Sequence, residues 1–291
     1  MAGRAGNQFF RYSAAAKISK ELNEKMVFNF KPVFNAGFSN NLDALRIDNY
    51  IEDDGTIYKN NASLTQKILV LIYRIIYKIL VKKPKYLFLF QKKFIRLFNW
   101  FDITFSDFRT IDVKFRNKHN LKILLGCFEN PKLLSDDIKN YVNKYDISEP
   151  NKGFYNKILN SNSVCITIRR GDFLIFKEHN ICDEKFYYNA IEIMKNELYN
   201  PVFFIFSDDI EWCKNNIIID NYEVYYETGK DTIGEKIKLM TSCKHFIISN
   251  STFSWWAQHL SNNQDKFVIG PQKMYTFDID SELIEENWRK L

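Results

Sequence analysis

The chain has 291 residues, of which 46% are hydrophobic and 26% charged, and this composition is typical of a soluble globular protein. The length exceeds what one small core needs and predicts two domains of about 150 residues each. The N-terminus has no apolar signal-peptide segment, so we expect a cytoplasmic protein. Five dispersed cysteines without CxxC spacing argue against a disulfide framework and a zinc site: Cys127, Cys165, Cys182, Cys213 and Cys243.

The net charge of +6 has a local origin. Residues 55–101 contain no acidic residue, and removing their basic residues leaves 31 basic against 35 acidic residues in the rest of the chain. This uneven distribution argues against general nucleic-acid binding, and we expect no nucleic-acid partner. The basic residues of the segment are Lys59, Lys67, Arg74, Lys78, Lys82, Lys83, Lys85, Lys92, Lys93 and Arg96.

Residues 3–8 (GRAGNQ) form a glycine-containing loop, and helical spacing of apolar residues follows over 9–23. Such a junction lets backbone N–H groups face a ligand, and the start of a helix favours an anion. A Rossmann-like unit would place a strand of about five apolar residues before this loop. Only Met1 and Ala2 precede it here, which fits a truncated or mis-started N-terminus. The next apolar run, 26–30, predicts a strand.

The basic stretch 55–101 predicts an amphipathic helical insertion in the N-terminal domain. Within 64–81, three basic residues (Lys67, Arg74 and Lys78) share one helical face, and these charges argue against a membrane-spanning helix. A basic amphipathic helix with aromatic flanks can lie on an anionic membrane surface. The alternative is a helix packed on the domain with its lysines solvated, and the sequence leaves both interpretations open.

The second half of the chain predicts a doubly wound, parallel α/β sheet. Residues 147–153 are the best linker candidate, which gives an N-terminal domain of 1–153 and a C-terminal domain of 154–291. Apolar runs then alternate with helical patterns, as in parallel sheets with crossover helices. The expected strands are 164–168, 202–206, 223–226, 245–249 and 267–269, and the expected helices are 184–198, 210–216, 235–243 and 252–260.

Polar residues follow three of these strands. In open α/β sheets, ligands bind at the carboxyl ends of the strands. Arginine forks suit phosphate, whereas carboxylates suit ribose hydroxyls or a guanine edge. The alternative at each strand end is an ordinary turn or helix N-cap. The three groups are Arg169, Arg170 and Asp172; Ser207, Asp208 and Asp209; and Asn250, Ser251, Thr252 and Ser254.

Metal chemistry has little support in the sequence. The four histidines show no paired ligand spacing, so we expect no catalytic zinc. Asp278 and Asp280 form a DxD pattern that could bind a metal–nucleotide complex, but their polar C-terminal setting favours a solvated turn.

Three segments resemble the α-1,2-fucosyltransferases of glycosyltransferase family 11. Residues 3–8 are similar to their G-R/G-x-G-N-Q loop, and 166–172 to their H-x-R-R-x-D motif. Residues 239–257 (LMTSCKHFIISNSTFSWWA) are similar to their L-M-S-x-C-K-H-x-I-I-A-N-S-S-F-S-W-W-A segment. The resemblance covers 3–23 and about 122–272 but not 55–101, and Thr167 stands where the family motif has histidine.

The resemblance implies a GT-B fold, in which two Rossmann-like domains face a cleft. It also implies an inverting, metal-independent transfer of fucose from GDP-β-L-fucose to the 2-hydroxyl of a terminal β-galactoside. No cofactor is expected. Acceptors would include lipid-linked glycans, which are built at the inner face of the membrane.

The resemblance assigns roles to the candidate residues. Arg169 and Arg170 would bind the diphosphate, and Arg169 would also stabilise leaving-group charge. Arg4 and Asn7 would help position donor and acceptor, and Asn7 and Asp172 join Arg169 as catalytic candidates. The sequence does not identify the general base, for which Asp172 and Glu129 are both candidates. The remaining donor-binding candidates are Ser207, Asp208, Asp209, Asn250, Ser251, Thr252 and Ser254.

Two rival functions remain at this point. One is another fucosyltransferase of related fold, such as an α-1,6- or O-fucosyltransferase, against which the Ser-Phe-Ser-Trp-Trp segment argues. The other, from a different class, is a non-catalytic peripheral membrane module. Such a module would bind liposomes but show no affinity for nucleotides.

Overall fold

The computed structural model describes residues 1–107, 109, 111, 113–175, 180–276 and 281–291. It is an α/β protein in which the strands of the described residues pair in parallel. The chain forms two compact units: unit 1 comprises mainly Met1–Asp43 and Ile47–Asp137, and unit 2 mainly Ile138–Thr276.

The division between the units falls earlier than the predicted boundary between residues 153 and 154. Residues 138–153 belong to unit 2 because hydrogen bonds fasten them there. The backbone N–H of Ser148 donates to Glu235 at 2.9 Å, and the Asn151 amide donates to Asp231 at 2.8 Å. The segment expected as a linker is therefore packed structure.

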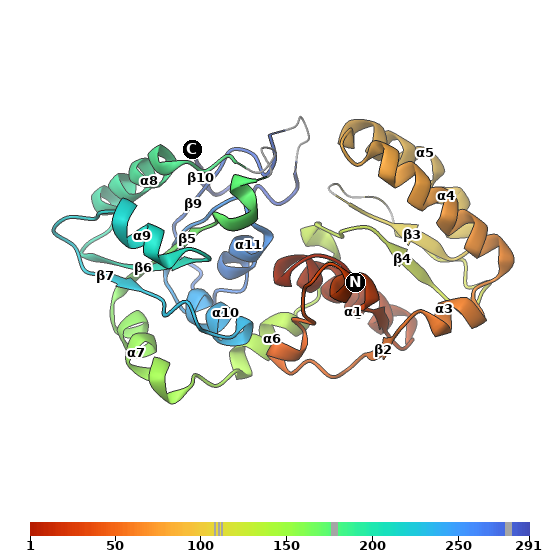
Figure 1. The fold of residues 1–291 in the computed structure, drawn as a ribbon, viewed down its shortest axis with the longest axis horizontal. Helices are drawn as coiled ribbons and strands as arrows, with labels where there is room; N and C mark the ends of the chain where they lie inside the picture. The colour runs from red at the N-terminus through yellow and green to blue at the C-terminus, as the bar shows by residue number, and fades with distance from the viewer. Residues whose placement is uncertain (108, 110, 112, 176–179, 277–280) are drawn as a thin grey trace. The chain divides into compact units, whose positions relative to one another are not determined.

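Unit 1 contains two separate two-stranded sheets, β1–β2 and β3–β4 (Figure 1). Its helices include three that lie between β2 and β3 in the sequence. The elements are α1 (Ala5–Leu22), β1 (Val27–Asn29), α2 (Lys31–Asn35), β2 (Ile51–Asp53), α3 (Thr56–Asn61), α4 (Leu64–Leu80), α5 (Pro84–Trp100), β3 (Ile103–Phe105) and β4 (Ile123–Leu125), with short 3-10 turns at Asp43–Leu45 and Pro131–Leu133.

Helix α1 begins at Ala5, so much of the glycine-containing loop is its first turn. Gly3 has a φ of +75°, and a side chain there would come within 2.8 Å of the Asn7 amide nitrogen. The buried Gln8 donates to the carbonyl oxygens of Gly3 and Ser39 at 2.9 and 3.0 Å. Gln8 therefore fixes the loop that precedes the helix.

The basic stretch is confirmed as helical, but its inner face belongs to the core of unit 1. Ser63 caps α4 in a capping box with Gln66, which fixes where the helix starts. Tyr73 of α4 stacks on Phe105 of β3 with ring centroids 4.9 Å apart. The helices thus cover β3 and β4 and are more than an appended insertion.

The outer face of α4 is apolar and exposed. Its side chains recur at intervals of three and four residues, so they share one face. Among the described residues, no helix combines the length and the apolarity needed to cross a bilayer. The exposed residues of this face, between 41 and 75% accessible, are Leu64, Ile68, Leu71, Ile72, Ile75 and Ile79.

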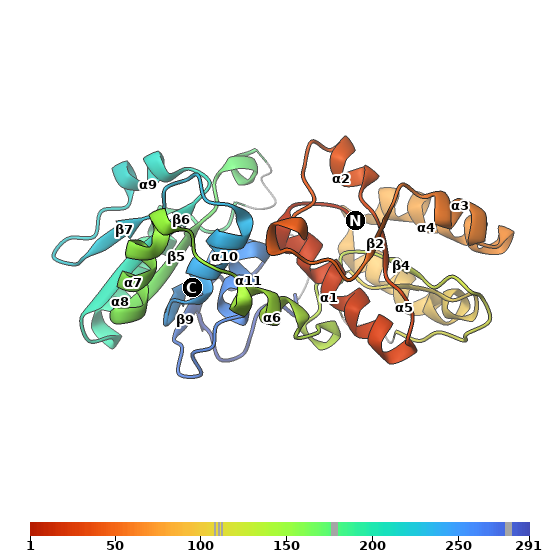
Figure 2. The same cartoon turned by 90° about the horizontal axis from the view of Figure 1, so that it is seen from below.

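Unit 2 contains a six-stranded parallel sheet with the strand order β10-β9-β8-β5-β6-β7 (Figures 1 and 2). The predicted alternation of strands and helices is confirmed here. The elements are α6 (Asp137–Lys144), α7 (Lys152–Asn160), β5 (Asn162–Ile168), α8 (Glu184–Glu197), β6 (Pro201–Ser207), α9 (Ile210–Asn216), β7 (Val224–Tyr226), α10 (Ile233–Thr241), β8 (His245–Ile247), α11 (Thr252–His259), β9 (Val268–Gly270) and β10 (Arg289–Lys290), with 3-10 turns at Glu149–Asn151 and Gly171–Leu174.

The central strands β5, β6 and β8 are buried on both faces. Helix α8 packs on one face through side chains such as Ala190 and Met194, whereas Phe154 of α7 contacts Phe204 on the other face. The chain proceeds outward from β5 to β7 and then returns to place β8 on the other side of β5. The sheet therefore has a topological switch point between β5 and β8, where doubly wound sheets bind ligands.

Candidate active site

Arg169 directly follows β5 at the carboxyl edge of the sheet in unit 2. Its Nε and Nη2 atoms donate to Oδ1 of Asp172 at 3.1 and 2.6 Å, and Nη1 lies 2.9 Å from Oδ2 of Asp208. Asp208 follows β6, whose last residue Ser207 pairs with Ile168 of β5. The parallel register of β5 and β6 therefore brings the carboxylate of Asp208 against the guanidinium of Arg169.

Arg170 is held differently. Its backbone N–H donates to Asp208 Oδ1 at 2.9 Å, and its Nε donates to Asp209 Oδ2 at 3.3 Å. The guanidinium lies 3.5 Å from the centre of the Trp212 ring, a cation–π contact. In the part of the chain that the structure describes, Nη1 and Nη2 of Arg170 donate no hydrogen bond, and the guanidinium pairs with Asp209 through Nε.

The charges at this edge are nearly balanced. Three carboxylates (Asp172, Asp208 and Asp209) surround two guanidiniums, so the cluster carries a formal charge of −1. A diphosphate would have to compete with carboxylates for Arg169, whereas Arg170 offers two nitrogens directly. The carboxylates of the cluster thus orient the two arginines. Of these, Arg170 is better placed to donate hydrogen bonds to a phosphate.

A hollow of about 180 Å³ opens beside this cluster. Arg169, Arg170, Tyr187, Trp212 and Asn250 contribute to its lining. Helix α8 begins at the hollow, and its capping residue, which also lines it, accepts a hydrogen bond from the third helical residue. The volume is below the roughly 300–1,000 Å³ of typical ligand pockets, so the hollow suits a group about the size of one phosphate.

Of the polar residues that follow β8 (Asn250, Ser251, Thr252 and Ser254), only Asn250 lines this hollow. Asn250 lines the hollow, and its amide donates to the Met274 carbonyl oxygen at 3.0 Å. Ser251 is the N-cap of α11 and accepts from the backbone N–H of Phe253 at 3.3 Å. Ser254 is buried, and its hydroxyl lies 2.9 Å from that of Ser249. Ser251 therefore has the ordinary capping role that was the alternative interpretation.

Asp209 and Ser207 also serve the start of a helix. Asp209 Oδ1 accepts from the backbone N–H of Trp212 at 3.2 Å, which caps α9. The Ser207 hydroxyl accepts from the backbone N–H of Asp209 at 3.0 Å. Asp209 also pairs with Arg170. At this strand end the same carboxylate can therefore cap a helix and belong to a ligand site.

Thr167, which replaces the motif histidine, faces the interior of the sheet. It is 3% exposed, and its hydroxyl accepts from the backbone N–H of Ser249 at 3.1 Å. The Tyr187 hydroxyl donates to its carbonyl oxygen at 3.2 Å. Thr167 thus joins β5 to the segment after β8 at the switch point, and its side chain does not line the hollow.

Sequence reasoning missed a fourth strand end. Glu227 follows β7, and its fully buried carboxylate accepts from the backbone N–H of Ser207 at 2.7 Å. Lys236 Nζ lies 2.7 Å from its Oε2 atom. Burial raises the pKa of Glu227, although Lys236 opposes that shift. The sequence signal for Glu227 was an acidic residue directly after a short apolar run. Trp212 and Tyr187 also line the hollow, but nothing in the sequence distinguishes them from aromatic residues of the core.

Arg4 and Asn7 lie in unit 1. Arg4 immediately precedes α1, with its guanidinium 5.3 Å from the centre of the Phe38 ring. Asn7 is in the first turn of α1, against Gly3. Glu129, one of the two general-base candidates, is 2% exposed in the same unit.

Unit 1 also contains a buried carboxylate that the sequence did not reveal. Asp107 follows β3, and its Oδ2 atom accepts from the Tyr73 hydroxyl at 3.0 Å and from the Gln91 amide. Its Oδ1 atom accepts from the backbone N–H of Cys127 at 2.9 Å. These partners lie far apart in the sequence, so no local pattern points to them.

The described residues contain no group of three histidine, cysteine, aspartate or glutamate side chains that could hold a metal ion. Asp278 and Asp280 lie outside the described residues.

Known proteins similar to this chain are glycosyltransferases. The profile of the family described as Glycosyl transferase family 11 matches residues 1–290. An Escherichia coli α-1,2-colitosyltransferase is 29% identical over 285 residues, covering 93% of this chain and 89% of that protein. A Bos taurus galactoside 2-α-L-fucosyltransferase, SEC1, is 27% identical over 115 residues, covering 37% of this chain and 31% of that protein. The crystal structure of NodZ α-1,6-fucosyltransferase soaked with GDP-fucose is 13% identical, with a TM-score of 0.49 and 89% of each chain covered.

Proposed function

Because the chain belongs to glycosyltransferase family 11 and is similar to galactoside 2-α-L-fucosyltransferases, we propose that it transfers L-fucose from GDP-β-L-fucose to the 2-hydroxyl of a terminal β-galactoside. In this reaction, the acceptor oxygen forms a bond to the anomeric carbon as the bond to the diphosphate breaks. The hydroxyl proton passes to a base, and GDP leaves. The acceptor belongs to a surface glycan or a related oligosaccharide.

The arginine–aspartate cluster at the switch point of unit 2 carries this proposal. Arg170 lines a phosphate-sized hollow, and Trp212 and Asp209 hold its guanidinium in place. Preorganised charge of this kind stabilises the diphosphate as it leaves, which is work that needs no metal ion. Asp172 and Asp208 hold the guanidinium of Arg169 at the same strand end.

The remaining candidate residues complete the proposed mechanism. Asp208 and Asp209 hold the nucleoside or orient the arginines, and Asn250 contributes to the phosphate pocket together with Ser207, Ser251, Thr252 and Ser254. Arg4 and Asn7, which lie in unit 1, help to position the donor and the acceptor. Asp172 and Glu129 remain the candidates for the general base.

The direct test is calorimetric titration with GDP in the presence of EDTA. We expect micromolar binding by the wild type and a loss of about 10- to 100-fold in Arg170→Ala, because charge-assisted hydrogen bonds contribute about 1.5–3 kcal/mol each. Arg170→Lys keeps the charge but not the fork and should fall between the two. Binding that requires Mn²⁺, or that Arg170→Ala leaves intact, would contradict the proposal.

One observation supports colitose as an alternative donor sugar. The relative named α-1,2-colitosyltransferase matches 93% of this chain, whereas the named fucosyltransferase matches 37%. Colitose lacks the 3-hydroxyl of L-fucose. A site that hydrogen-bonds this hydroxyl rejects the deoxy sugar by about 10⁴- to 10⁵-fold. Comparing kcat/KM for GDP-fucose and GDP-colitose on one galactoside decides between the two donors.

We further propose that the outer face of α4 docks on an anionic membrane, where lipid-linked acceptors are built. Exposed apolar residues, among them Leu64, Ile68 and Ile79, lie on one face, and basic residues flank it. This combination is typical of interfacial helices. Reversing the charges of Lys78, Lys82 and Lys83 should abolish cosedimentation with phosphatidylserine vesicles, whereas reversing Lys152 and Lys157 in unit 2 should not. Undiminished cosedimentation of the first variant would rule out this proposal.

A further inference from the structure

Strand β6 leads directly into the arginine–aspartate cluster, and it extends beyond its edge neighbour β7. The pairing of β6 with β7 ends at Ile205 and Tyr226, whereas β6 continues to Ser207 (Figure 1). On its other side, β6 stays paired with β5 as far as Ser207 and Ile168. Among the described residues, the end of β6 is therefore paired with a strand on the β5 side only.

The side chain of Glu227 replaces the next ladder hydrogen bond between β7 and β6. The Phe203 N–H donates to the Glu223 carbonyl oxygen at 2.9 Å, and in a parallel ladder this pattern repeats at alternate residues. A longer β7 would therefore offer the carbonyl oxygen of Glu227 to the Ser207 N–H. That N–H donates instead to the Glu227 carboxylate, at 2.7 Å.

The acceptor at this point is a buried charge. The Glu227 side chain has no exposed surface, and its counter-charge is Lys236 of α10, with Nζ 2.9 Å from Oε1 and 2.7 Å from Oε2. Replacing a buried ion pair by apolar residues is often neutral or stabilising, so stability alone is a weak reason for such a pair. Neither side chain lines the hollow beside the cluster. The pair therefore acts on a ligand only through the residues that it holds.

The residues at and after the end of β6 connect this pair to both arginines. The Ser207 hydroxyl accepts from the Asp209 N–H at 3.0 Å, and Asp209 Oδ2 accepts from Arg170 Nε at 3.3 Å. Asp208 accepts from the Arg170 N–H at 2.9 Å and lies 2.9 Å from Nη1 of Arg169. Both carboxylates thus extend from the segment whose first N–H is held from β7. A shift of Ser207 would displace both of them.

We propose that Glu227, neutralised by Lys236, is a positioning residue of the donor site: it fixes the carboxyl end of β6 and thereby the two carboxylates that hold Arg170. The role rests on the proposed function, in which Arg170 binds the diphosphate of the donor. A carboxylate suits this task because a hydrogen bond to a charged acceptor is stronger than one to a neutral acceptor. A displacement of about 1 Å in a positioned group can cost about 10²-fold in rate, so a fixed strand end matters for transfer.

A direct contact between Glu227 and the nucleotide is the alternative role. Against it, the carboxylate is fully buried, and its oxygens already accept from the Ser207 N–H and pair with Lys236. The two roles predict different results on substitution. Direct contact depends on the negative charge, whereas positioning depends on an acceptor for the Ser207 N–H.

Two double variants separate these roles. Glu227→Gln with Lys236→Met, the glutamine variant, removes both charges but keeps an amide oxygen that can accept from the Ser207 N–H. Glu227→Leu with Lys236→Met, the leucine variant, removes both charges and the acceptor at similar volume. Glu227→Met with Lys236→Met repeats the second design with a longer side chain, in case the leucine variant does not fold. Met194→Ala is the control for loss of core packing in unit 2.

Hydrogen exchange measures the position of the strand end without any ligand. In the leucine variant we expect exchange at the N–H groups of Ser207, Asp209 and Arg170 to speed by at least about tenfold, because the bonds that protect them depend on the end of β6. The glutamine variant should stay close to the wild type. Faster exchange at Ser207 alone would overturn the proposal, because the two carboxylates would then keep their places without Glu227.

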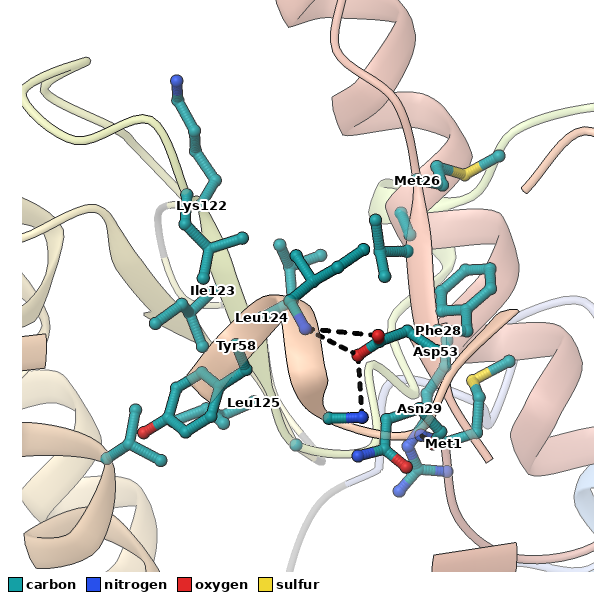
Figure 3. Close-up of a pocket in the computed structure, with 18 of the residues that line it drawn as sticks. Met1, Met26, Phe28, Asn29, Asp53, Tyr58, Lys122, Ile123, Leu124 and Leu125 are labelled. Carbon is teal, nitrogen blue, oxygen red and sulfur yellow. Dashed lines mark hydrogen bonds between the residues drawn. The ribbon is translucent and has the colours of Figure 1, made fainter. Parts of the chain in front are cut away.

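Unit 1 supplies reference amides for this measurement. Figure 3 shows the carboxylate of Asp53, the last residue of β2, which accepts from the backbone N–H of Gly55 at 2.7 Å and of Ile57 at 3.2 Å. Exchange at Gly55 and Ile57 should be the same in every variant. Faster exchange there in the leucine variant would indicate a general loosening of the fold and contradict a local role for Glu227.

Calorimetric titration with GDP then relates the strand end to the donor site. We expect the leucine variant to bind GDP at least about tenfold more weakly, and the glutamine variant and Met194→Ala to bind within about threefold of the wild type. Adding Arg170→Ala to the leucine variant should weaken binding little further, because both changes act on the same guanidinium.

Equal losses of GDP affinity in the glutamine and leucine variants would overturn the proposal, because binding would then depend on the charge. So would fully additive effects of the leucine variant and Arg170→Ala. A wild type that does not bind GDP would contradict the proposed function itself. The exchange experiment contains no nucleotide, so it would still decide whether Glu227 fixes the end of β6.

Discussion

At the scale of single residues, the site in unit 2 depends on contacts between strand ends. Arg170 and Asp208 are 38 positions apart in the sequence, and Thr167 and Ser249 are 82 apart, yet each pair is hydrogen-bonded. The parallel register aligns them. We therefore expect substitutions of residues that join strands, such as Thr167, to lower mainly stability, and substitutions of residues that line the hollow, such as Arg170, to weaken mainly ligand binding.

Replacing Thr167 by valine keeps the shape of the side chain but removes its hydroxyl. The backbone N–H of Ser249 then loses a buried acceptor, so we expect a loss of about 1–3 kcal/mol in the free energy of unfolding, measured with urea. Thr167→Ser, which retains the hydroxyl, should cost clearly less. If both variants are as stable as the wild type, Thr167 does not join the two strands.

The Glu227–Lys236 pair gives a prediction with a defined pH dependence. Lys236→Met leaves a buried carboxylate without its counter-charge and should cost about 3–5 kcal/mol at pH 7. Because burial raises the pKa of Glu227 above its unfolded value, the folded state binds the proton more readily, and stability falls as pH rises through the folded pKa. The deficit of Lys236→Met should therefore shrink between pH 7 and pH 5.

The control for this pair is the double variant Lys236→Met with Glu227→Gln. With no carboxylate left to bury, its deficit should be smaller than that of Lys236→Met at pH 7 and nearly independent of pH. A Lys236→Met deficit that grows on acidification would contradict the assignment.

At the scale of elements, the helices of the basic stretch are held on the sheet by buried polar groups as well as aromatics. Gln66 of α4 donates to the carbonyl oxygens of Phe101 and Leu121 at 2.8 and 3.0 Å, and Gln91 of α5 reaches Asp107. These bonds fix which face of each helix is buried. The faces left outside carry the lysines and the apolar residues of α4.

Asp102 organises the segment between β3 and β4. Its carboxylate accepts four backbone hydrogen bonds, from Arg116, Asn117, Lys118 and His119, at 2.7 to 2.8 Å. Asp102→Asn exchanges one acceptor oxygen for an N–H donor, so we expect a loss of about 2–3 kcal/mol at pH 7, measured by thermal or urea unfolding.

The Asp102 prediction also has a pH signature. Burial alone would raise the pKa of Asp102, but hydrogen bonds from His119, Lys118 and Arg116 together hold it below its usual value. A lowered carboxyl pKa contributes stability above the unfolded pKa of about 3.9 and loses it as pH falls through the folded pKa. The gap between wild type and Asp102→Asn should therefore narrow below about pH 4, and a gap that widens there would contradict this account.

At the scale of the whole molecule, the two units should respond differently to the donor nucleotide. GDP at 100 times its Kd stabilises the structure that binds it by about 2.7 kcal/mol. With the donor site in unit 2, hydrogen exchange should slow at the carboxyl ends of β5, β6 and β8. The core of β3 and β4 in unit 1 should be unchanged. The reverse pattern would place the nucleotide in unit 1.

The sequence by itself determined most of unit 2. Its apolar runs are long and separated by helical patterns, so the strands, the helices and the parallel sheet follow from local periodicity. The position of Arg169 and Arg170 at the end of a strand follows from the same pattern. The family motifs in residues 3–8, 166–172 and 239–257 added the class of enzyme, which the comparison with known proteins confirms.

Only the tertiary structure decided which groups meet. Asp208 on Arg169, Glu227 on Ser207 and Asp107 on Tyr73 are contacts across long stretches of sequence, and no local pattern encodes them. The short strands of unit 1 gave weak periodicity, so their pairing into two separate sheets appeared only in three dimensions. Local order follows from neighbouring residues, whereas sites arise from register and packing between distant ones.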